Sequence, residues 1–160
     1  MGYWDEYLKN DKVKQKLLKY ILFKKRTEAE VRTKIEDIIE KLDISDLGDE
    51  VDFVNNLIEE LKEQGYINDE RYIEKSFLEF INLKTLSIKE MKLKLLMKGL
   101  DKELVEQYID NNEEKLKEYE LNSAKKIVQK KSTNLEPIKI KQYLIKRGYS
   151  EDSINLSVTC

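Results

Sequence analysis

The sequence predicts an all-α protein made of three tandem three-helix repeats in an elongated, curved array. Along most of the chain, apolar residues recur at the three-and-four spacing of an amphipathic helix. Charged residues make up 39% of the 160 residues, whereas glycine occurs five times and proline once, a composition that favours helices with solvated faces over sheets needing many turns. Similar segments return along the chain, which is typical of tandem repeats.

The first repeat is expected to begin with a helix over residues 5–24. Its apolar side consists of Val13, Leu17, Leu18, Ile21 and Leu22. A second helix follows Thr27, whose spacing to Glu30 fits a capping box, in which each residue bonds the backbone amide of the other. A third helix is predicted to end at Gly65, because glycine readily takes the left-handed conformation found at helix ends.

The second repeat has the clearest helix signals. Asp69 is expected to cap its first helix. Ser87 and Glu90 predict a capping box at the start of the second helix. Gly99 is the predicted left-handed end of that helix, and Asp101 is the predicted cap of the third.

The third repeat starts with a highly charged helix over residues 113–131. Its apolar stripe is thin, so its N-terminal half is expected to stand partly in solvent. Pro137 opens the next helix, because a proline in the first turn lacks only an amide that would be unpaired there. Gly148 ends that helix, and Ser150 caps a short last one.

The repeats become visible when the second helices are aligned at Thr27, Ser87 and Glu136. The apolar positions four and eight residues later then coincide: Val31, Met91 and Ile140, followed by Ile35, Leu95 and Leu144. We therefore predict repeats over residues 1–66, 67–112 and 113–160.

The sequence offers little catalytic chemistry. It contains no histidine, which is the commonest general base and metal ligand near neutral pH. Its one cysteine, Cys160, has no histidine to activate it. Helix capping accounts for Asp49 and Asp69 without a metal ion. We expect no enzyme activity, no metal and no cofactor. The absence of any eighteen-residue apolar run indicates a cytoplasmic protein rather than a membrane one.

Basic residues recur with the repeats. Arg32, Lys92 and Lys141 each lie five positions after a second-helix cap, and Lys98 and Arg147 each precede an end glycine. A cation in a last helical turn is also explained by the helix dipole, and single charged residues often only solvate a helix. As a group, these side chains are expected to be exposed and to form a row that binds an acidic or polyanionic partner.

The segments GYINDERY (65–72) and LLMKGLD (95–101) resemble the RecX family of RecA regulators. Weaker matches are RTEAEVRTKI (26–35) and YLIKRGYS (143–150). The resemblance covers roughly residues 13–158. Most matched positions are expected to serve the fold, among them Gly65, Tyr66, Asp69, Gly99 and Gly148.

The resemblance implies a non-enzymatic regulator that binds RecA filaments on DNA and inhibits ATP hydrolysis and strand exchange in recombination and DNA repair. We expect a monomer that contacts DNA together with RecA. The candidate contacts are Arg26, Arg32, Lys92, Lys98, Lys141, Lys146 and Arg147. The alternative is a stand-alone single-stranded nucleic-acid-binding module, for which Tyr143 and Tyr149 are candidate stacking residues.

Overall fold

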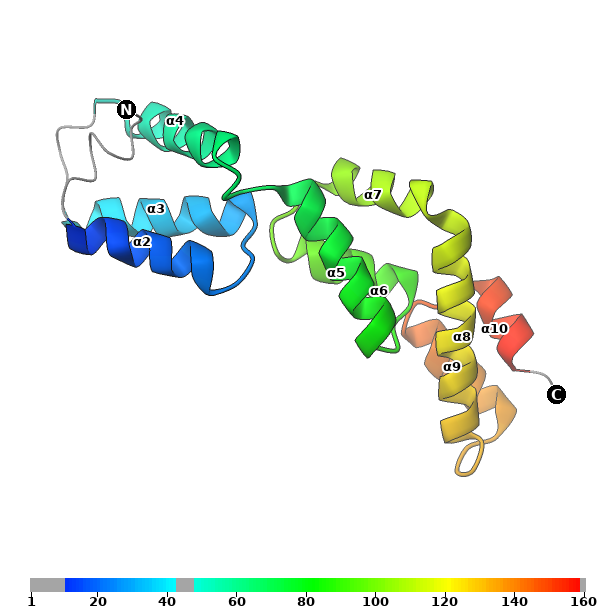
Figure 1. Cartoon of the computed structure of the whole chain (residues 1–160). Coiled ribbons are helices and arrows are strands. Elements are labelled where there is room, and N and C mark those ends of the chain that lie inside the picture. The colour runs from blue at the N-terminus through cyan, green and yellow to red at the C-terminus, as the bar shows by residue number, and fades with distance from the viewer. Residues whose placement is uncertain (1–10, 43–47, 159–160) are drawn as a thin grey trace. The chain divides into compact units, whose positions relative to one another are not determined.

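The computed structural model describes residues 11–42 and 48–158 (Figure 1). Its helices are α2 (Asp11–Phe23), α3 (Glu28–Leu42), α4 (Glu50–Glu63), α5 (Asp69–Leu83), α6 (Ile88–Leu96), α7 (Lys102–Asn111), α8 (Glu113–Lys131), α9 (Pro137–Lys146) and α10 (Glu151–Ser157). No strand occurs among the described residues, so the predicted all-α class is confirmed. Residues 5–10 of the predicted first helix and Cys160 lie outside them.

The chain folds into two units. The first comprises Met1–Tyr72 and Lys98–Leu100, and the second comprises Ile73–Met97 and Asp101–Cys160. One border falls inside α5 and another follows α6. The helix order is compatible with three repeats, and the predicted repeat boundaries after residues 66 and 112 stay predictions.

In the first unit, α3 packs against both α2 and α4. Its fully buried core residues include Leu17, Val31, Leu57 and Leu61. Leu22 was predicted on the apolar side of α2, but its side chain is 68% exposed. The prediction fails because α2 is buried along its Leu17 and Ile21 side, and Leu22 lies about 100° further around the helix. The side chain of Val13 lies outside the described residues.

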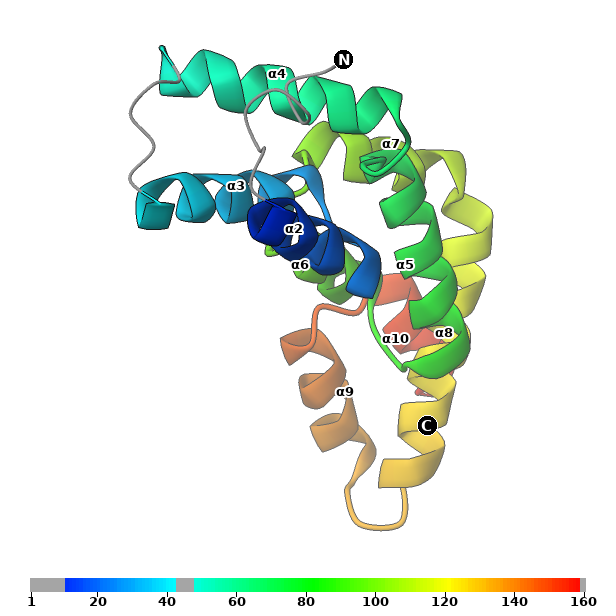
Figure 2. The same ribbon diagram turned by 60° about the vertical axis from the view of Figure 1, so that its left-hand side comes forward.

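In the second unit, α8 packs against α10 (Figures 1 and 2). A cluster of buried residues from α8, α9 and α10 includes Ala124, Ile140 and Ile154. The N-terminal half of α8 was expected to stand partly in solvent. Most of its residues are exposed as expected, among them Lys115 and Lys117, but Leu116 is buried and Glu120 is only 2% exposed, so this half is also anchored.

The predicted capping boxes are confirmed at the starts of α3 and α6. The Ser87 side chain accepts from the Glu90 N–H at 3.0 Å, and the Glu90 carboxylate accepts from the Ser87 N–H at 3.0 Å. Thr27 and Glu30 form the same pair of bonds, both at 3.1 Å. Two otherwise unpaired amides are satisfied at each helix start.

The predicted helix ends are confirmed at three glycines. Gly65, Gly99 and Gly148 have φ angles of 82°, 83° and 86°. After Gly65, the Tyr66 N–H donates to the Leu61 carbonyl at 2.9 Å, which satisfies a free carbonyl at the end of α4. The side chain of Tyr66 is exposed, so this residue closes the helix through its backbone rather than its ring.

Asp69 caps a different helix from the one predicted. The cap of α5 is Asn68, whose side-chain oxygen accepts from the Arg71 N–H at 3.0 Å. The Asp69 carboxylate accepts from the Glu28 N–H at 2.9 Å and so satisfies the first amide of α3. Burial raises the pKa of the Asp69 carboxyl, although this hydrogen bond opposes the rise. Sequence spacing could not reveal a partner 41 residues away.

Candidate partner-binding surface

The backbone at Lys98, a predicted partner contact that follows α6, is positioned by the start of α3. The Thr27 hydroxyl, which caps α3, donates to the Lys98 carbonyl at 2.9 Å. A Cβ atom built on the next residue, Gly99, would lie 2.5 Å from the Cβ of Ala29 in the first turn of α3. The backbone that carries Lys98 is therefore held against the N-terminus of α3, within the first unit.

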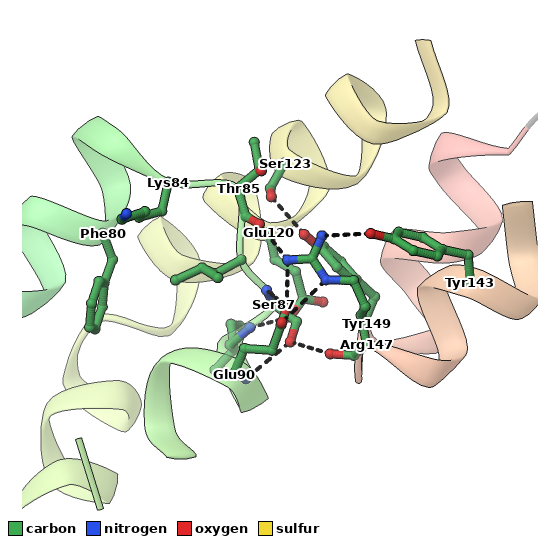
Figure 3. Close-up of polar contacts among 12 residues, drawn as sticks. Phe80, Lys84, Thr85, Ser87, Glu90, Glu120, Ser123, Tyr143, Arg147 and Tyr149 are labelled. Atoms are coloured by element: carbon green, nitrogen blue, oxygen red, sulfur yellow. Dashed lines mark hydrogen bonds and ion pairs between the residues drawn. The ribbon is translucent and has the colours of Figure 1, made fainter. Parts of the chain in front are cut away.

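An equivalent arrangement holds the end of α9 against the start of α6. The Ser87 hydroxyl donates to the Arg147 carbonyl at 2.8 Å (Figure 3). A Cβ atom on Gly148 would lie 3.0 Å from the Lys89 side chain. Both ends lie in the second unit. The capping hydroxyl of one second helix thus bonds the carbonyl before the end glycine of the next.

A carboxylate completes each arrangement. Asp69 accepts from the first amide of α3, and Glu120 accepts from the Ile88 N–H, the first amide of α6, at 2.8 Å. Glu120 also accepts from the Ser150 N–H at 2.9 Å and from the Ser153 hydroxyl at 2.8 Å. This buried carboxylate therefore joins the starts of α6 and α10. The sequence analysis did not single it out.

Arg147 is a structural residue rather than a free cation. Its guanidinium donates to the Glu90 carboxylate at 3.0 and 3.2 Å and to the Thr85 carbonyl at 2.6 Å (Figure 3). Its side chain is 23% exposed. The prediction that Arg147 is exposed and lacks an acidic partner is wrong, because that partner lies 57 residues away on α6.

Three further candidate cations are also engaged within the protein. Lys92 pairs with Glu106 at 2.7 Å, and Arg32 donates to the Asn55 side chain at 2.7 Å. Arg26 donates to the Tyr20 carbonyl at 3.0 Å, and its guanidinium lies 3.8 Å from the centre of the Tyr20 ring. All three are half-buried, so the predicted exposure of Lys92 and Arg32 is also wrong.

Lys98, Lys141 and Lys146 remain available for a partner. Lys98 and Lys146 are exposed, whereas Lys141 is half-buried, so its predicted exposure is wrong as well. None of the three forms an ion pair with another residue in the described part of the chain. Lys98 belongs to the first unit, whereas Lys141 and Lys146 lie on α9 in the second.

Exposed apolar side chains accompany these lysines on the second helices. Met97, next to Lys98, is 86% exposed, and Leu93 on α6 is 50% exposed. Ile138 and Ile145 on α9 are 58% and 64% exposed and lie seven residues apart, on the side of the helix that carries Lys141. Sequence periodicity did not find them, because an isolated exposed apolar residue resembles a core residue when only spacing is considered. Basic and apolar groups together suit a protein partner.

The two candidate stacking residues are not free to stack on bases. Tyr149 is buried, and its hydroxyl lies 2.8 Å from the Ser123 hydroxyl (Figure 3). Tyr143 is half-buried, with the Lys131 ammonium 4.1 Å from the centre of its ring and its hydroxyl 3.4 Å from the Arg147 guanidinium. A tyrosine beside a cation therefore reflects packing within the protein at both positions.

Burial raises the pKa of Tyr149 to about 12. The folded state consequently keeps this proton above the ordinary pKa of 10.0, whereas the unfolded state loses it. Unfolding releases a proton in this range, so the free energy of unfolding should fall between about pH 10 and pH 12, by about 1 to 3 kcal/mol. Denaturant titrations across this range should show a smaller fall in Tyr149→Phe. An identical pH profile in both proteins would contradict the assignment.

The described residues include no group of three or more histidine, cysteine, aspartate or glutamate side chains that could hold a metal ion. Among the same residues, no helix has the length and apolar character needed to cross a membrane.

The chain is similar to several proteins of one family. It is 30% identical over 141 residues to a regulatory protein RecX of Staphylococcus carnosus, covering 86% of this chain and 49% of that protein. It is 26% identical over 153 residues to a regulatory protein RecX of Caldanaerobacter subterraneus, covering 95% and 72%. No family model matches the chain.

A solved structure from the same family is also similar to this chain. The crystal structure of RecX from Lactobacillus salivarius matches with a TM-score of 0.70 and 26% sequence identity, over 92% of each chain. The chain spans about half the length of the first curated relatives, at 49% and 51% of their residues. These relatives are named as regulatory proteins.

Proposed function

We propose that this chain, which belongs to the RecX family of regulatory proteins, binds the RecA filament on DNA and inhibits RecA's ATP hydrolysis and strand exchange. The observation that carries the proposal is its likeness, over 86% of its length, to a protein named for regulation. The proposed partner is the one implied by the RecX resemblance of residues 65–72 and 95–101. We expect the chain to act as a cytoplasmic monomer in recombination and DNA repair.

A regulator that acts only by binding must bind one state of its target more tightly than another. A ligand shifts a conformational equilibrium only by as much as it prefers one state over another. A chain that binds one state of the filament stabilises that state and slows every step that must leave it. The proposal therefore needs no catalytic group, and it needs a surface that the filament can contact.

We assign this role to residues of each unit separately: Lys98 in the first unit, and Lys141 and Lys146 with the exposed apolar residues of α6 and α9 in the second. Charges at the edge of an interface steer association and select the partner, while apolar side chains at its centre supply affinity. Arg147, Lys92, Arg32 and Arg26 are left out because each is already bonded within the protein. Binding a partner through these four side chains would first break the contacts that they make within the protein.

Reversing the charge of the three available lysines tests this assignment. In Lys98→Glu/Lys141→Glu/Lys146→Glu, co-sedimentation with RecA on single-stranded DNA should weaken by about tenfold or more, which corresponds to about 1.4 kcal/mol. The melting temperature should stay nearly unchanged, because none of the three lysines forms an ion pair among the described residues and charges at or near the surface contribute little to stability. The loss should shrink at high salt, where screening has already removed most of the attraction.

A matched control carries the same change in net charge on another element. Lys16→Glu/Lys19→Glu/Lys24→Glu alters three exposed lysines on and just after α2. This control should sediment with the filament as the unmodified protein does. Equal weakening in both triple variants would show a general charge effect, and no weakening in the first would contradict the assigned surface.

A further inference from the structure

A groove between α3 and α4 lies within the first unit and contains none of the three lysines assigned above. The two helices run side by side in opposite directions (Figures 1 and 2). The groove has a volume of about 660 Å³, and we call it the α3–α4 groove. Among its lining residues, α3 contributes Glu36, Ile39 and Glu40, and α4 contributes Glu50, Val51 and Val54.

The floor of the groove is apolar. Ile39 and Val54 are 5% and 2% exposed and belong to the core of the first unit. Val51, in the first turn of α4, is 66% exposed. An apolar side chain of a partner that entered the groove would remove Val51 from water, which favours binding.

The rim of the groove is acidic. Its three glutamates are exposed, and none of them forms an ion pair with another described residue. The lining also includes Arg32, but the Arg32 guanidinium lies 3.9 Å from the Glu28 carboxylate and donates to the Asn55 side chain. The groove therefore carries negative charge that the first unit does not compensate.

Helix stability explains only part of this charge. Glu50 lies in the first turn of α4, where the helix dipole favours an anion. Glu40 lies in the last turn of α3, where the dipole disfavours one. Glu36 follows Arg32 by four residues, yet the Arg32 guanidinium is turned toward Glu28 instead. Neither Glu36 nor Glu40 has a stabilising role in α3 that would account for it.

We propose that the α3–α4 groove binds a basic amphipathic helix of a protein partner. The apolar side chains of this helix would enter the groove, and its lysines or arginines would meet the glutamates of the rim. Glu36 and Glu40 lie about 6 Å apart along the axis of α3. Basic side chains four residues apart on a partner helix have the same spacing, so two ion pairs can form together. The apolar floor favours a protein over a polyamine or a metal cation, since neither of these would cover Val51.

Fluorescence anisotropy with the full chain and a labelled peptide, without RecA, tests this proposal. The probe is a helical peptide of about 15 residues with leucines three and four positions apart and lysines beside them, in an alanine background. It should bind, and Glu36→Gln/Glu40→Gln/Glu50→Gln should weaken the binding by about tenfold or more at about 50 mM salt. The matched control, Glu63→Gln/Glu74→Gln/Glu118→Gln, removes three exposed carboxylates elsewhere and should bind as the unmodified chain does.

Changes in the peptide separate the apolar contacts and the helical form from the charges. Alanine in place of the leucines should weaken binding by about tenfold, because apolar burial is lost while every lysine stays. A central proline, which breaks the helix, should weaken it by about as much. On the protein, Val51→Ser should weaken binding by about threefold, since it removes the exposed apolar side chain of the groove.

The melting temperature separates a binding role from a structural one. Glu40→Gln removes a charge that the dipole of α3 disfavours, so its melting temperature should stay the same or rise slightly while its peptide affinity falls. A structural role would predict a lower melting temperature.

Four results would overturn the proposal: no binding of the peptide to the unmodified chain, unchanged affinity in the triple groove variant, equal weakening in its control, or equal binding of the proline peptide. Sedimentation of the unmodified chain at increasing concentration tests a second copy as the occupant. Self-association that the triple groove variant abolishes would also overturn the proposal. Because RecA is absent from these experiments, their failure would leave the proposed regulation of RecA to its own test.

Discussion

Gly99→Ala is expected to lower the free energy of unfolding by about 3 kcal/mol or more. Two costs combine at this position. The φ angle of 83° is left-handed, which costs a residue with a Cβ atom about 1 to 2 kcal/mol. The added Cβ would also lie 2.5 Å from the Cβ of Ala29, so the backbone at Gly99 and the start of α3, both in the first unit, must separate. Overpacking of this kind typically costs about 1 to 3 kcal/mol.

Gly65→Ala is the matched control for the backbone cost. Gly65 has nearly the same φ angle, 82°, but a Cβ built there meets nothing within 4 Å. Gly65→Ala should therefore lower the free energy of unfolding by about 1 to 2 kcal/mol. Adding Ala29→Gly to Gly99→Ala removes the clashing methyl group and should restore the share of the free energy of unfolding that the clash costs. Denaturant unfolding of the two single variants and the double variant, compared as a double-mutant cycle, measures this share. Equal losses in the two single glycine variants would contradict the close approach.

Glu120→Ala is expected to destabilise the protein by about 3 to 5 kcal/mol. The Glu120 carboxylate is 2% exposed and accepts from Ile88, Ser150 and Ser153. Hydrogen bonds to a charged group are worth about 1.5 to 3 kcal/mol each, and removing the acceptor leaves buried donors unsatisfied. The starts of α6 and α10 would lose their shared contact at the same time.

Glu118→Ala provides the comparison on the same helix. Glu118 is exposed, and its truncation should change the free energy of unfolding by less than about 0.5 kcal/mol. The loss of stability in Glu120→Gln should lie between those of Glu120→Ala and Glu118→Ala. The amide keeps one acceptor oxygen but turns its NH₂ group toward a donor. A loss below about 1 kcal/mol in Glu120→Ala would show that water replaces the carboxylate, contrary to its burial.

Local signals in the sequence were sufficient for the helices and their ends. The capping boxes at Thr27 and Ser87 and the left-handed glycines depend on residues within four positions of each other, so spacing alone specifies them. Partners distant in sequence were missed. Asp69 and Arg147 each bond a residue more than 40 positions away, and no local pattern distinguishes such a pair from a solvated charge.

Glu120 was the one missed residue with a usable signal. It lies four residues after Leu116 and four before Ala124, on the apolar stripe of α8. A carboxylate at a buried position of a helix requires hydrogen-bond donors from elsewhere, which predicts a structural contact. The available lysines could not be separated from the engaged ones in the same way, because their difference depends on tertiary partners such as Glu106 for Lys92.

RecA's DNA-dependent ATP hydrolysis, measured with increasing amounts of this chain, tests the central proposal most directly. We expect the rate to fall to a plateau as the filament becomes saturated, since a bound regulator acts in proportion to its occupancy. Lys98→Glu/Lys141→Glu/Lys146→Glu should need a higher concentration to reach the same inhibition, and the α2 control should not. An unchanged rate at saturating amounts of the folded, unmodified chain would contradict the proposed function.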